Sequence, residues 1–235
     1  MGKIIKNLLG SLLGMTLNRE RYDSLLPKHY DSASEQAEVF CRDLDRFLRY
    51  FNICRLDENC SFLDLGSGNN DLSIPLSDRR IPHVLFNDRR INFETDHIPL
   101  GDNAFDVILF KAVIEHLNDP TNILNNIMRM LTPGGITVIT TPNYDYNIRS
   151  FWNDPTHQHP YNPISLGKLL AVHGFEVSQL RPFFFRKPSI YWKLPFWLGA
   201  KIPFKNHTYP QWPIPNILRG NTTVLLAVAK KPAAG

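Results

Sequence analysis

One stretch of the sequence holds an unusual density of side chains that can exchange protons. Between Trp152 and Tyr161 the chain places Asp154, His157 and His159 in one short segment. An imidazole titrates near neutral pH and a carboxylate can orient it, so this set can take a proton from a hydroxyl group. The alternative is that these polar residues only hold an irregular lid together. A His-x-His metal site lacks a clear third ligand in the sequence, so no metal is expected.

A second stretch has the pattern of a ligand-binding turn. An apolar run that begins at Cys60 ends in Asp64 and breaks at once into Gly66-Ser67-Gly68. Glycines let a ligand approach the backbone closely. A helix expected from about Asn70 would direct its free N–H groups and positive dipole end at that ligand. The pattern therefore predicts a ligand that carries a carboxylate or a phosphate.

An acid follows at a distance that suits a nucleoside. The run His83-Val84-Leu85-Phe86-Asn87-Asp88 is typical of a strand that ends in a carboxylate, 24 residues after Asp64. A carboxylate at this place can accept both hydroxyls of a ribose. A dinucleotide fingerprint would need glycine at position 71, where the chain has Asp71. That difference argues against a nicotinamide cofactor.

Three more short motifs follow in order. They are Asp102-Asn103-Ala104-Phe105-Asp106, Glu115-His116-Leu117-Asn118-Asp119-Pro120 and Leu131-Thr132-Pro133-Gly134-Gly135. Together with the glycine turn, they resemble the class I S-adenosylmethionine-dependent methyltransferases. The resemblance covers roughly residues 60 to 180, and the succession of motifs is more specific than any one of them.

The resemblance implies a doubly wound α/β fold, the Rossmann-like methyltransferase fold, with a mostly parallel sheet of seven strands and an antiparallel last strand. It implies S-adenosylmethionine as the cofactor, lined by these residues: Asp64, Gly66, Ser67, Gly68, Asp88, Glu94, Asp96 and Lys111. Glu94, or Asp96 in its place, falls where an acid commonly meets the adenine amino group. His116 falls near the methyl group, where lining the cofactor is favoured over catalysis. The catalytic candidates are therefore Asp154, His157, His159 and His116.

Two features depart from the family pattern. The third glycine of the family's loop is replaced by Asn70, the residue type that best tolerates a left-handed backbone after glycine. The interval from Asp88 to the expected third strand, Ile91–Glu94, leaves no room for the usual helix.

The remaining elements follow from periodicity and punctuation. Ser32 begins a capping box for a helix to about Phe51, whose buried face is expected to hold Val39, Leu44, Phe47 and Leu48. Asp119-Pro120 is typical of a helix start, with Asp as the N-cap. Further expected elements are strands at 105–110, 135–140, 175–177 and 222–229 and a helix at 163–173. We expect one domain over 1–235, with helical residues 1–55, a cofactor-binding core 56–182, an insertion 183–220 and a last strand and tail 221–235.

The charge is unevenly distributed. The whole chain carries +4, but no Asp or Glu follows Glu176, so the nine basic residues after it leave 17 basic and 22 acidic residues before it. An excess of one sign usually indicates a partner of the other sign. Cys41, Cys54 and Cys60 lack a C-x-x-C spacing, which argues for a reducing compartment without structural disulfides or a zinc site.

Both ends of the chain have membrane-surface features. An amphipathic helix is expected over 3–13, either packed on the domain or lying at an interface. Residues 183–212 hold ten aromatic residues among lysines and arginines: Phe183, Phe184, Phe185, Tyr191, Trp192, Phe196, Trp197, Phe204, Tyr209 and Trp212. Such a segment suits an anionic membrane surface or the stacking of sugar rings, and the alternative is a Pro-rich flap folded over the domain. We expect a cytoplasmic protein, peripheral at the inner membrane face.

These observations predict an enzyme that methylates an oxygen of a glycan, a glycolipid or another membrane-associated acceptor. One alternative is a protein that keeps the fold but binds rather than catalyses. A nucleic-acid methyltransferase is a third possibility, encouraged by the basic tail. Against it, the N/D-P-P-Y/F signature of amino-group methylation is missing, and the basic segment is rich in Pro and apolar residues.

Overall fold

A computed structural model describes residues 33–68, 72–183, 204–205, 219–220 and 224–233, all within the unit Ala33–Gly235. The capping box at Ser32, the amphipathic segment 3–13, Asn70 and most of the insertion lie outside the described residues. The single domain and its four parts stay a prediction.

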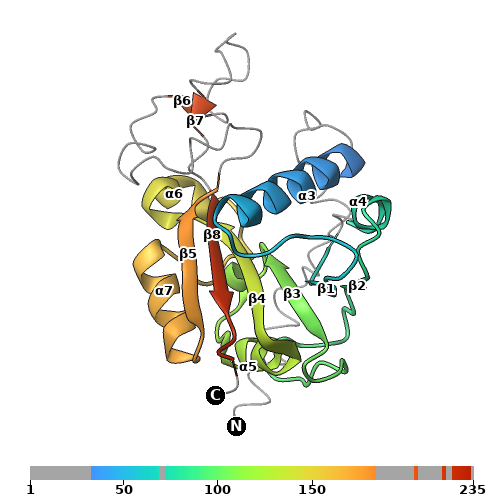
Figure 1. Cartoon of the computed structure of the whole chain (residues 1–235). Coiled ribbons are helices and arrows are strands. Elements are labelled where there is room, and N and C mark those ends of the chain that lie inside the picture. Colours follow the sequence, from blue (N-terminus) through green and yellow to red (C-terminus); the bar gives the residue numbers. More distant parts are fainter. Residues whose placement is uncertain (1–32, 69–71, 184–203, 206–218, 221–223, 234–235) are drawn as a thin grey trace. The chain divides into compact units, whose positions relative to one another are not determined.

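Six strands form the main sheet, in the order β2-β1-β3-β4-β8-β5 (Figure 1). Their bounds are β1 Phe62–Leu65, β2 His83–Phe86, β3 Phe105–Lys111, β4 Leu131–Pro142, β5 Glu176–Pro182 and β8 Val224–Lys230. Strands β2, β1, β3 and β4 are parallel, and β8 is antiparallel to both β4 and β5. The doubly wound fold and the antiparallel last strand are confirmed.

The expected third strand is wrong, and the main sheet has six strands instead of seven. Residues 91–92 belong to no helix or strand and residues 93–95 form a turn, held by short side chains that bond to the local backbone. Asp96 accepts the backbone N–H of Asn92 at 2.8 Å, and the Asn92 side chain accepts that of Glu94 at 2.9 Å. These bonds offer the chain an alternative to a sheet ladder.

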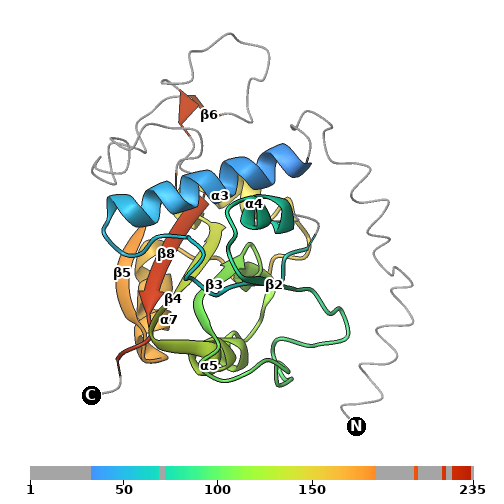
Figure 2. The same ribbon diagram turned by 45° about the vertical axis from the view of Figure 1, so that its right-hand side comes forward.

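Helices cover both faces of this sheet (Figures 1 and 2). They are α3 Ala33–Tyr50, α4 Ser73–Asp78, the 3₁₀ turn η1 Ile114–His116, α5 Thr121–Met130, α6 Tyr144–Phe151 and α7 Pro163–Val172. One core packs α3 and α4 on the sheet, and a second core packs α5 and α7 on the other face. Leu44, Phe47 and Leu48 are buried in the first core as expected, whereas Val39 is only half-buried.

Two helix starts differ from the expected positions. Helix α5 begins at Thr121 with Pro120 as its N-cap, one residue later than expected. Asp119 instead accepts the N–H of Thr121 from outside the helix, at 2.9 Å. Helix α4 begins at Ser73 rather than near Asn70 and has six residues.

Alternation along the strands decides which side chains share a face. Phe62 and Val107 belong to the core under α3, whereas Leu63 and Ile108 belong to the core under α5 and α7. Because side chains alternate along a strand, Asp64 lies on the α3 face with Phe62, and Lys111 lies there with Val107. Two charged residues at strand ends therefore face the same helix.

The described part of the insertion begins inside the core. Phe183 is fully buried and packs edge-on against Phe40 and Phe47 of α3. Its N–H donates to Val224 of β8 at 2.9 Å. Phe183 was expected among the membrane-facing aromatics, and burial of its ring against α3 corrects that expectation. Further on, β6 (Phe204–Lys205) pairs in parallel with β7 (Arg219–Gly220).

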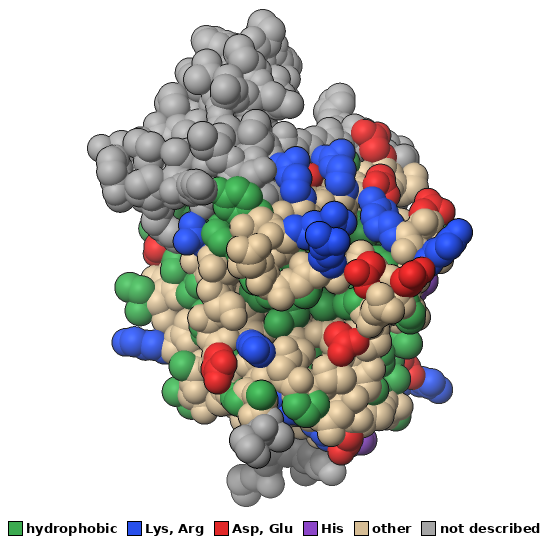
Figure 3. Space-filling model, in the orientation of Figure 1, with side chains coloured by type: hydrophobic (Ala, Val, Ile, Leu, Met, Phe, Trp, Pro, Cys, Tyr) green, Lys and Arg blue, Asp and Glu red, His purple; other side chains and the backbone are tan. Residues whose placement is uncertain are grey.

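The charged surface of α3 is internally paired. Lys and Arg side chains gather with acidic ones among them on the upper part of the face in Figure 3. Arg49 pairs with Asp45 within the helix, and Arg79 from α4 pairs with Glu38. This face is therefore a solvated surface. Among the described residues, no helix is both long enough and apolar enough to cross a bilayer.

Asp106, at the start of β3, ties three segments together. Its carboxylate accepts the N–H and the hydroxyl of Ser61 at 3.0 and 2.7 Å, and the hydroxyl of Thr132 at 2.9 Å. Burial raises the pKa of Asp106, but the hydrogen bonds from Ser61 and Thr132 outweigh it and hold the pKa below its ordinary value. Asp106 therefore has a structural role, as expected of a residue that closes a turn.

We predict that Asp106→Asn lowers the free energy of unfolding by about 1–3 kcal/mol at pH 7, because it removes the charged acceptor. A lowered folded pKa contributes stability above the ordinary value of 3.8 that is lost as the pH falls through the folded pKa. The difference in the free energy of unfolding between wild type and variant should therefore shrink below pH 3.8. Urea unfolding at several pH values measures this difference. The exposed Asp78→Asn is the control, and an equal loss in both variants would contradict the structural role of Asp106.

Candidate active site

The carboxyl ends of the parallel strands β1, β2, β3 and β4 meet at one edge of the sheet. Strand β1 has β2 on one side and β3 on the other, so the strand order reverses there. Ligands of doubly wound folds bind outside the carboxyl ends of the strands at such a reversal. Most of the candidate site residues lie at this edge.

The glycine turn follows β1 directly. Gly66 has a φ of +79°, and a Cβ there would lie 2.9 Å from Cγ2 of Val113. Glycine is therefore required both by the backbone and by the close approach of the segment after β3. Gly68 also has a positive φ, +57°, and its carbonyl accepts the side-chain amide of Asn87 at 3.1 Å. Asn87 thus ties the glycine turn to the end of β2, a contact that we did not predict.

Asp88 lies just beyond β2 and holds Arg90. Its carboxylate forms an ion pair with the Arg90 guanidinium at 2.7 Å and accepts the Arg90 backbone N–H at 3.0 Å. These bonds lower the pKa of Asp88 to about 2. Asp88 is therefore ionised, and its exposed ion pair is of the kind that contributes little to stability.

Glu94 and Asp96, the two candidates for contact with the adenine amino group, have different neighbours. Glu94 accepts the backbone N–H of Asn118 at 2.6 Å, which links the turn after β2 to the segment after η1. Asp96 is engaged within its own turn, by the N–H of Asn92 and the hydroxyl of Thr95. Those bonds lower the pKa of Asp96. Of the two acids, Glu94 is the one that joins separate segments at the edge.

Lys111, the last residue of β3, lies between Asp64 at the end of β1 and Glu115 in η1. Its ammonium lies over the ring of Phe40, 5.2 Å from the centroid. Burial lowers the pKa of Lys111, and the charges of Asp64 and Glu115 raise it in part. Asp64 is itself buried at the end of β1. A half-buried cation thus has carboxylates from two different segments as neighbours.

Glu115 in η1 is a buried carboxyl, only 1% exposed. Burial raises its pKa to about 7, and its own backbone amide, the Thr141 hydroxyl and Lys111 lower it only in part. Its Oε2 atom has no hydrogen-bond partner among the described residues. A buried acceptor without a partner is costly, so this atom is suited to a ligand group.

The segment with the two candidate histidines is attached to η1 by its backbone. The N–H groups of Gln158 and His159 both donate to the carbonyl of Glu115, at 2.7 and 3.0 Å. The His157 ring lies next to the His116 ring, with centroids 4.8 Å apart. His159 is exposed and stacks on Tyr161 instead, with centroids 4.9 Å apart. The structure therefore brings His157, not His159, to the edge.

The partners of His157 differ from those expected. Its Nδ1 lies 2.7 Å from the carbonyl of Phe151, so that carbonyl, rather than Asp154, orients the ring. Asp154 lies on the other side, with Oδ2 3.9 Å from Nε2 of His157. A carbonyl can only accept, so Nδ1 carries the hydrogen and Nε2 carries the lone pair of the neutral ring.

His116 is fixed in the same tautomer by a chain of three groups. The Thr156 hydroxyl donates to Asp154 at 2.6 Å and lies 2.9 Å from Nδ1 of His116. Since the hydroxyl hydrogen points to the carboxylate, Nδ1 of His116 must donate. Its Nε2 therefore carries the lone pair. The role of Thr156 was not predicted from the sequence.

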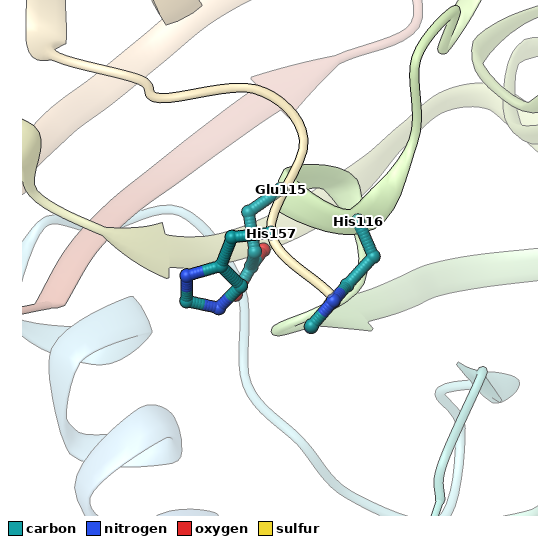
Figure 4. Close-up of side chains that lie close together, drawn as sticks. All are labelled: Glu115, His116 and His157. Carbon is teal, nitrogen blue, oxygen red and sulfur yellow. The ribbon is translucent and has the colours of Figure 1, made fainter. Parts of the chain in front are cut away.

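Glu115, His116 and His157 form one cluster (Figure 4). One nitrogen from each ring and one carboxylate oxygen all lie within 4.8 Å of one another. Glu115 and His116 come from η1, and His157 comes from the segment after α6. His157 follows Glu115 and His116 by about forty positions in the sequence, so local patterns could not place it beside them.

Further buried polar atoms lie close by at the end of β4. Both amide atoms of Asn143 and the Tyr161 hydroxyl have no hydrogen-bond partner among the described residues. Asn143 forms a bridge with Tyr161, and both are buried. Burial raises the pKa of Tyr161, and the charge of Glu115 adds to the shift. Sequence reasoning missed these residues, because no motif contains Asn143 and the positions depend on the β4 register.

Comparison with known proteins identifies the family. Residues 32–180 match the family model described as "Methyltransferase domain". A probable S-adenosylmethionine-dependent methyltransferase of Mycolicibacterium smegmatis is 36% identical over 83 residues, 34% of this chain and 32% of that protein. A ubiquinone biosynthesis O-methyltransferase of Rhizobium etli is 30% identical over 104 residues, 39% of this chain and 42% of that protein. The chain therefore spans less than half the length of these two relatives.

Solved structures agree on the fold. A SAM-dependent methyltransferase from Archaeoglobus fulgidus superimposes with a TM-score of 0.51 at 22% identity, over 83% of this chain and 94% of that one. The family match covers more than half of the chain and includes the glycine turn, the acid after β2 and the segment from β3 to α5. The chain belongs to the class I S-adenosylmethionine-dependent methyltransferases.

Proposed function

We propose that this protein methylates an oxygen atom of a hydroxyl-bearing acceptor at the carboxyl edge of its sheet. The observation that carries the proposal is the group of buried polar atoms at that edge that have no partner among the described residues, in Glu115, Asn143 and Tyr161. Such atoms are suited to a polar ligand with several hydroxyl groups. They lie beside a histidine whose lone pair can take a proton.

The residues of the edge fit the cofactor of the family. The Gly66 turn leaves its backbone open where a Cβ would collide with Val113. Asp88 is ionised and so can accept the hydroxyls of a ribose. The turn Gly66-Ser67-Gly68 and Asp64 would hold the amino-acid end, and Glu94 and Asp96 would lie toward the adenine. When bound, S-adenosylmethionine supplies a methyl group on a positively charged sulfur.

The chain's own part in the reaction is to align the acceptor and to remove a proton. Alignment of the acceptor oxygen contributes most of the rate in an in-line displacement. His157 is the proton acceptor that the geometry favours, because the Phe151 carbonyl fixes its Nδ1–H and leaves Nε2 basic. His116, in the same tautomer, lies beside it.

We further propose that the acceptor is a glycan, a glycolipid or another membrane-associated molecule. The aromatic and basic composition of residues 184–212 supports this class. Two large apolar side chains near the site support it as well, since Ile148 is 55% exposed and Trp152 is 53% exposed. The O-methyltransferase named among the relatives supports oxygen as the target. The protein would then work as a peripheral protein at the cytoplasmic face of a membrane.

The cofactor site is tested by S-adenosylhomocysteine binding in a calorimeter. Asp88→Asn should weaken binding roughly tenfold or more, because a ribose loses its charged acceptor. Arg90→Ala should bind at least as tightly as the wild type, since it frees the Asp88 carboxylate from its ion pair. Unchanged affinity in Asp88→Asn would show that the ribose lies elsewhere, and a wild type that binds nothing would overturn the proposed function.

The proton acceptor is tested by turnover with methyl-labelled S-adenosylmethionine and a lipid-linked glycan extract. His157→Ala should lose about 10²–10⁴-fold in rate with unchanged S-adenosylhomocysteine affinity. His159→Ala separates the two candidates, because its ring lies outside the cluster. The control is His173→Gln, at the far end of α7. A lowered melting temperature in His157→Ala together with lost cofactor binding would favour a purely structural lid.

Membrane association is tested by cosedimentation of the full chain with vesicles. Binding to anionic vesicles should exceed binding to neutral ones and should fall at high salt, since each Lys or Arg near the surface contributes on the order of 1 kcal/mol. Replacing Lys187, Lys193, Lys201 and Lys205 together by Gln should weaken it. If the wild type stays in the supernatant at low and at high salt, the acceptor does not have to be membrane-associated.

A further inference from the structure

We propose that Glu115, His116 and His157 bind one divalent transition-metal ion, for which Zn²⁺ is the reference ion, and that this ion binds the acceptor hydroxyl. The inference rests on the proposed function and changes one part of it. His157 holds the ion, and the ion takes over the activation of the hydroxyl.

The three side chains have the right ligand types. Two imidazole nitrogens and one carboxylate oxygen suit zinc, and with other geometries they suit iron, nickel or cobalt. In the structure one nitrogen of each ring and one Glu115 carboxylate oxygen lie within 4.8 Å of one another. Bonds of about 2.0–2.1 Å at tetrahedral angles place ligand atoms roughly 3.4 Å apart, so the longest separation has to close by about 1.4 Å. The closure requires movement of the His116 side chain, which is half-buried, and of the His157 side chain, which is 11% exposed.

Both imidazoles are already held in the form that binds a metal. Nδ1 of His157 donates to the Phe151 carbonyl at 2.7 Å. Nδ1 of His116 donates to the Thr156 hydroxyl at 2.9 Å, and that hydroxyl donates to Asp154 at 2.6 Å. The two Nε2 atoms therefore carry the lone pairs. Metal-binding histidines show this arrangement, in which the second ring nitrogen donates to a carbonyl or is linked to a carboxylate.

The buried carboxylate is a second, independent indication of a ligand. Glu115 is 1% exposed, and its Oε2 atom has no hydrogen-bond partner among the described residues. A purely structural glutamate in this position would be expected to satisfy both oxygens. A cation coordinated by Glu115 would engage that oxygen. Asp154 adds negative charge nearby, with Oδ2 3.9 Å from Nε2 of His157.

The position of the cluster gives the ion a chemical role. Three protein ligands leave at least one coordination position open, as in catalytic zinc sites. An acceptor hydroxyl bound there becomes more acidic, because the ion stabilises its conjugate base. The O–H bond then breaks, the electron pair stays on the metal-bound oxygen, and the proton passes to solvent water. The oxyanion that methylation needs is thereby formed at neutral pH without a basic His157.

The test measures Zn²⁺ binding directly. The full chain is stripped with EDTA, dialysed, and titrated with Zn²⁺ against a chromophoric chelator. We expect one equivalent to bind to the wild type. His157→Ala and Glu115→Gln should each weaken binding by at least about tenfold. Thr156→Val, which removes the hydroxyl that links Nδ1 of His116 to Asp154, should weaken it by roughly 10–100-fold. Thr156 is exposed, so this variant remains informative if Glu115→Gln folds poorly.

Controls separate this site from other ligands. His173→Gln, at the opposite edge of the sheet, should bind Zn²⁺ like the wild type. Burial raises the pKa of Cys41 to about 11 and that of Cys54 and Cys60 to about 12, so these thiols compete weakly. The proposal is overturned if the wild type binds no equivalent, or if the double variant His116→Ala/His157→Ala binds as tightly as the wild type.

Measurements on the same samples distinguish failure of the metal site from failure of the proposed methyltransferase function. S-adenosylhomocysteine affinity is measured in EDTA for the stripped wild type. Cofactor binding without Zn²⁺ binding would overturn the metal site and leave methylation with His157 as the proton acceptor. Zn²⁺ binding without cofactor binding would keep the metal site and overturn the proposed function.

Discussion

The half-buried ammonium of Lys111 is the constraint on which the rest of the site depends. A cation partly removed from water needs anionic neighbours, and Lys111 has them in Asp64 at the end of β1 and Glu115 in η1. It also lies over Phe40, which brings α3 across the same edge. The glycine turn, the segment after β3 and the first long helix are therefore joined through one side chain. Any change in its charge would be felt on both the cofactor side and the acceptor side.

The parts of the fold that depend on local signals were predictable. Apolar runs bounded by turn residues indicated β1, β2, β3 and β4, and a capped apolar pattern indicated α7. The succession of motifs was sufficient to predict the family, the strand reversal and the antiparallel last strand. The sequence pattern also indicated that a glycine is required at Gly66. The reason for it, the side chain of Val113, lies far away in the sequence. Local sequence patterns therefore predict the glycine turn and the strands around it.

The acceptor side was not predictable in the same way. The cluster of Glu115, His116 and His157 depends on two backbone hydrogen bonds to a single carbonyl, which no sequence pattern encodes. The expected strand at 91–94 failed because Asn92 and Asp96 bond to their own backbone. Competition of side chains for backbone hydrogen bonds cannot be read from hydrophobicity. Phe183 likewise looked like a surface aromatic, but it fills the core beneath α3.

The carbonyl of Glu115 receives two N–H groups, those of Gln158 and His159, and this has a consequence for how the protein can diversify. The attachment is made entirely by main-chain atoms, so it survives replacement of either side chain. Both side chains are exposed beside the cluster. Residues 158 and 159 can therefore vary while the backbone next to His157 keeps its position. The chain thus separates the main-chain atoms that attach this segment from the side chains that the segment presents to solvent.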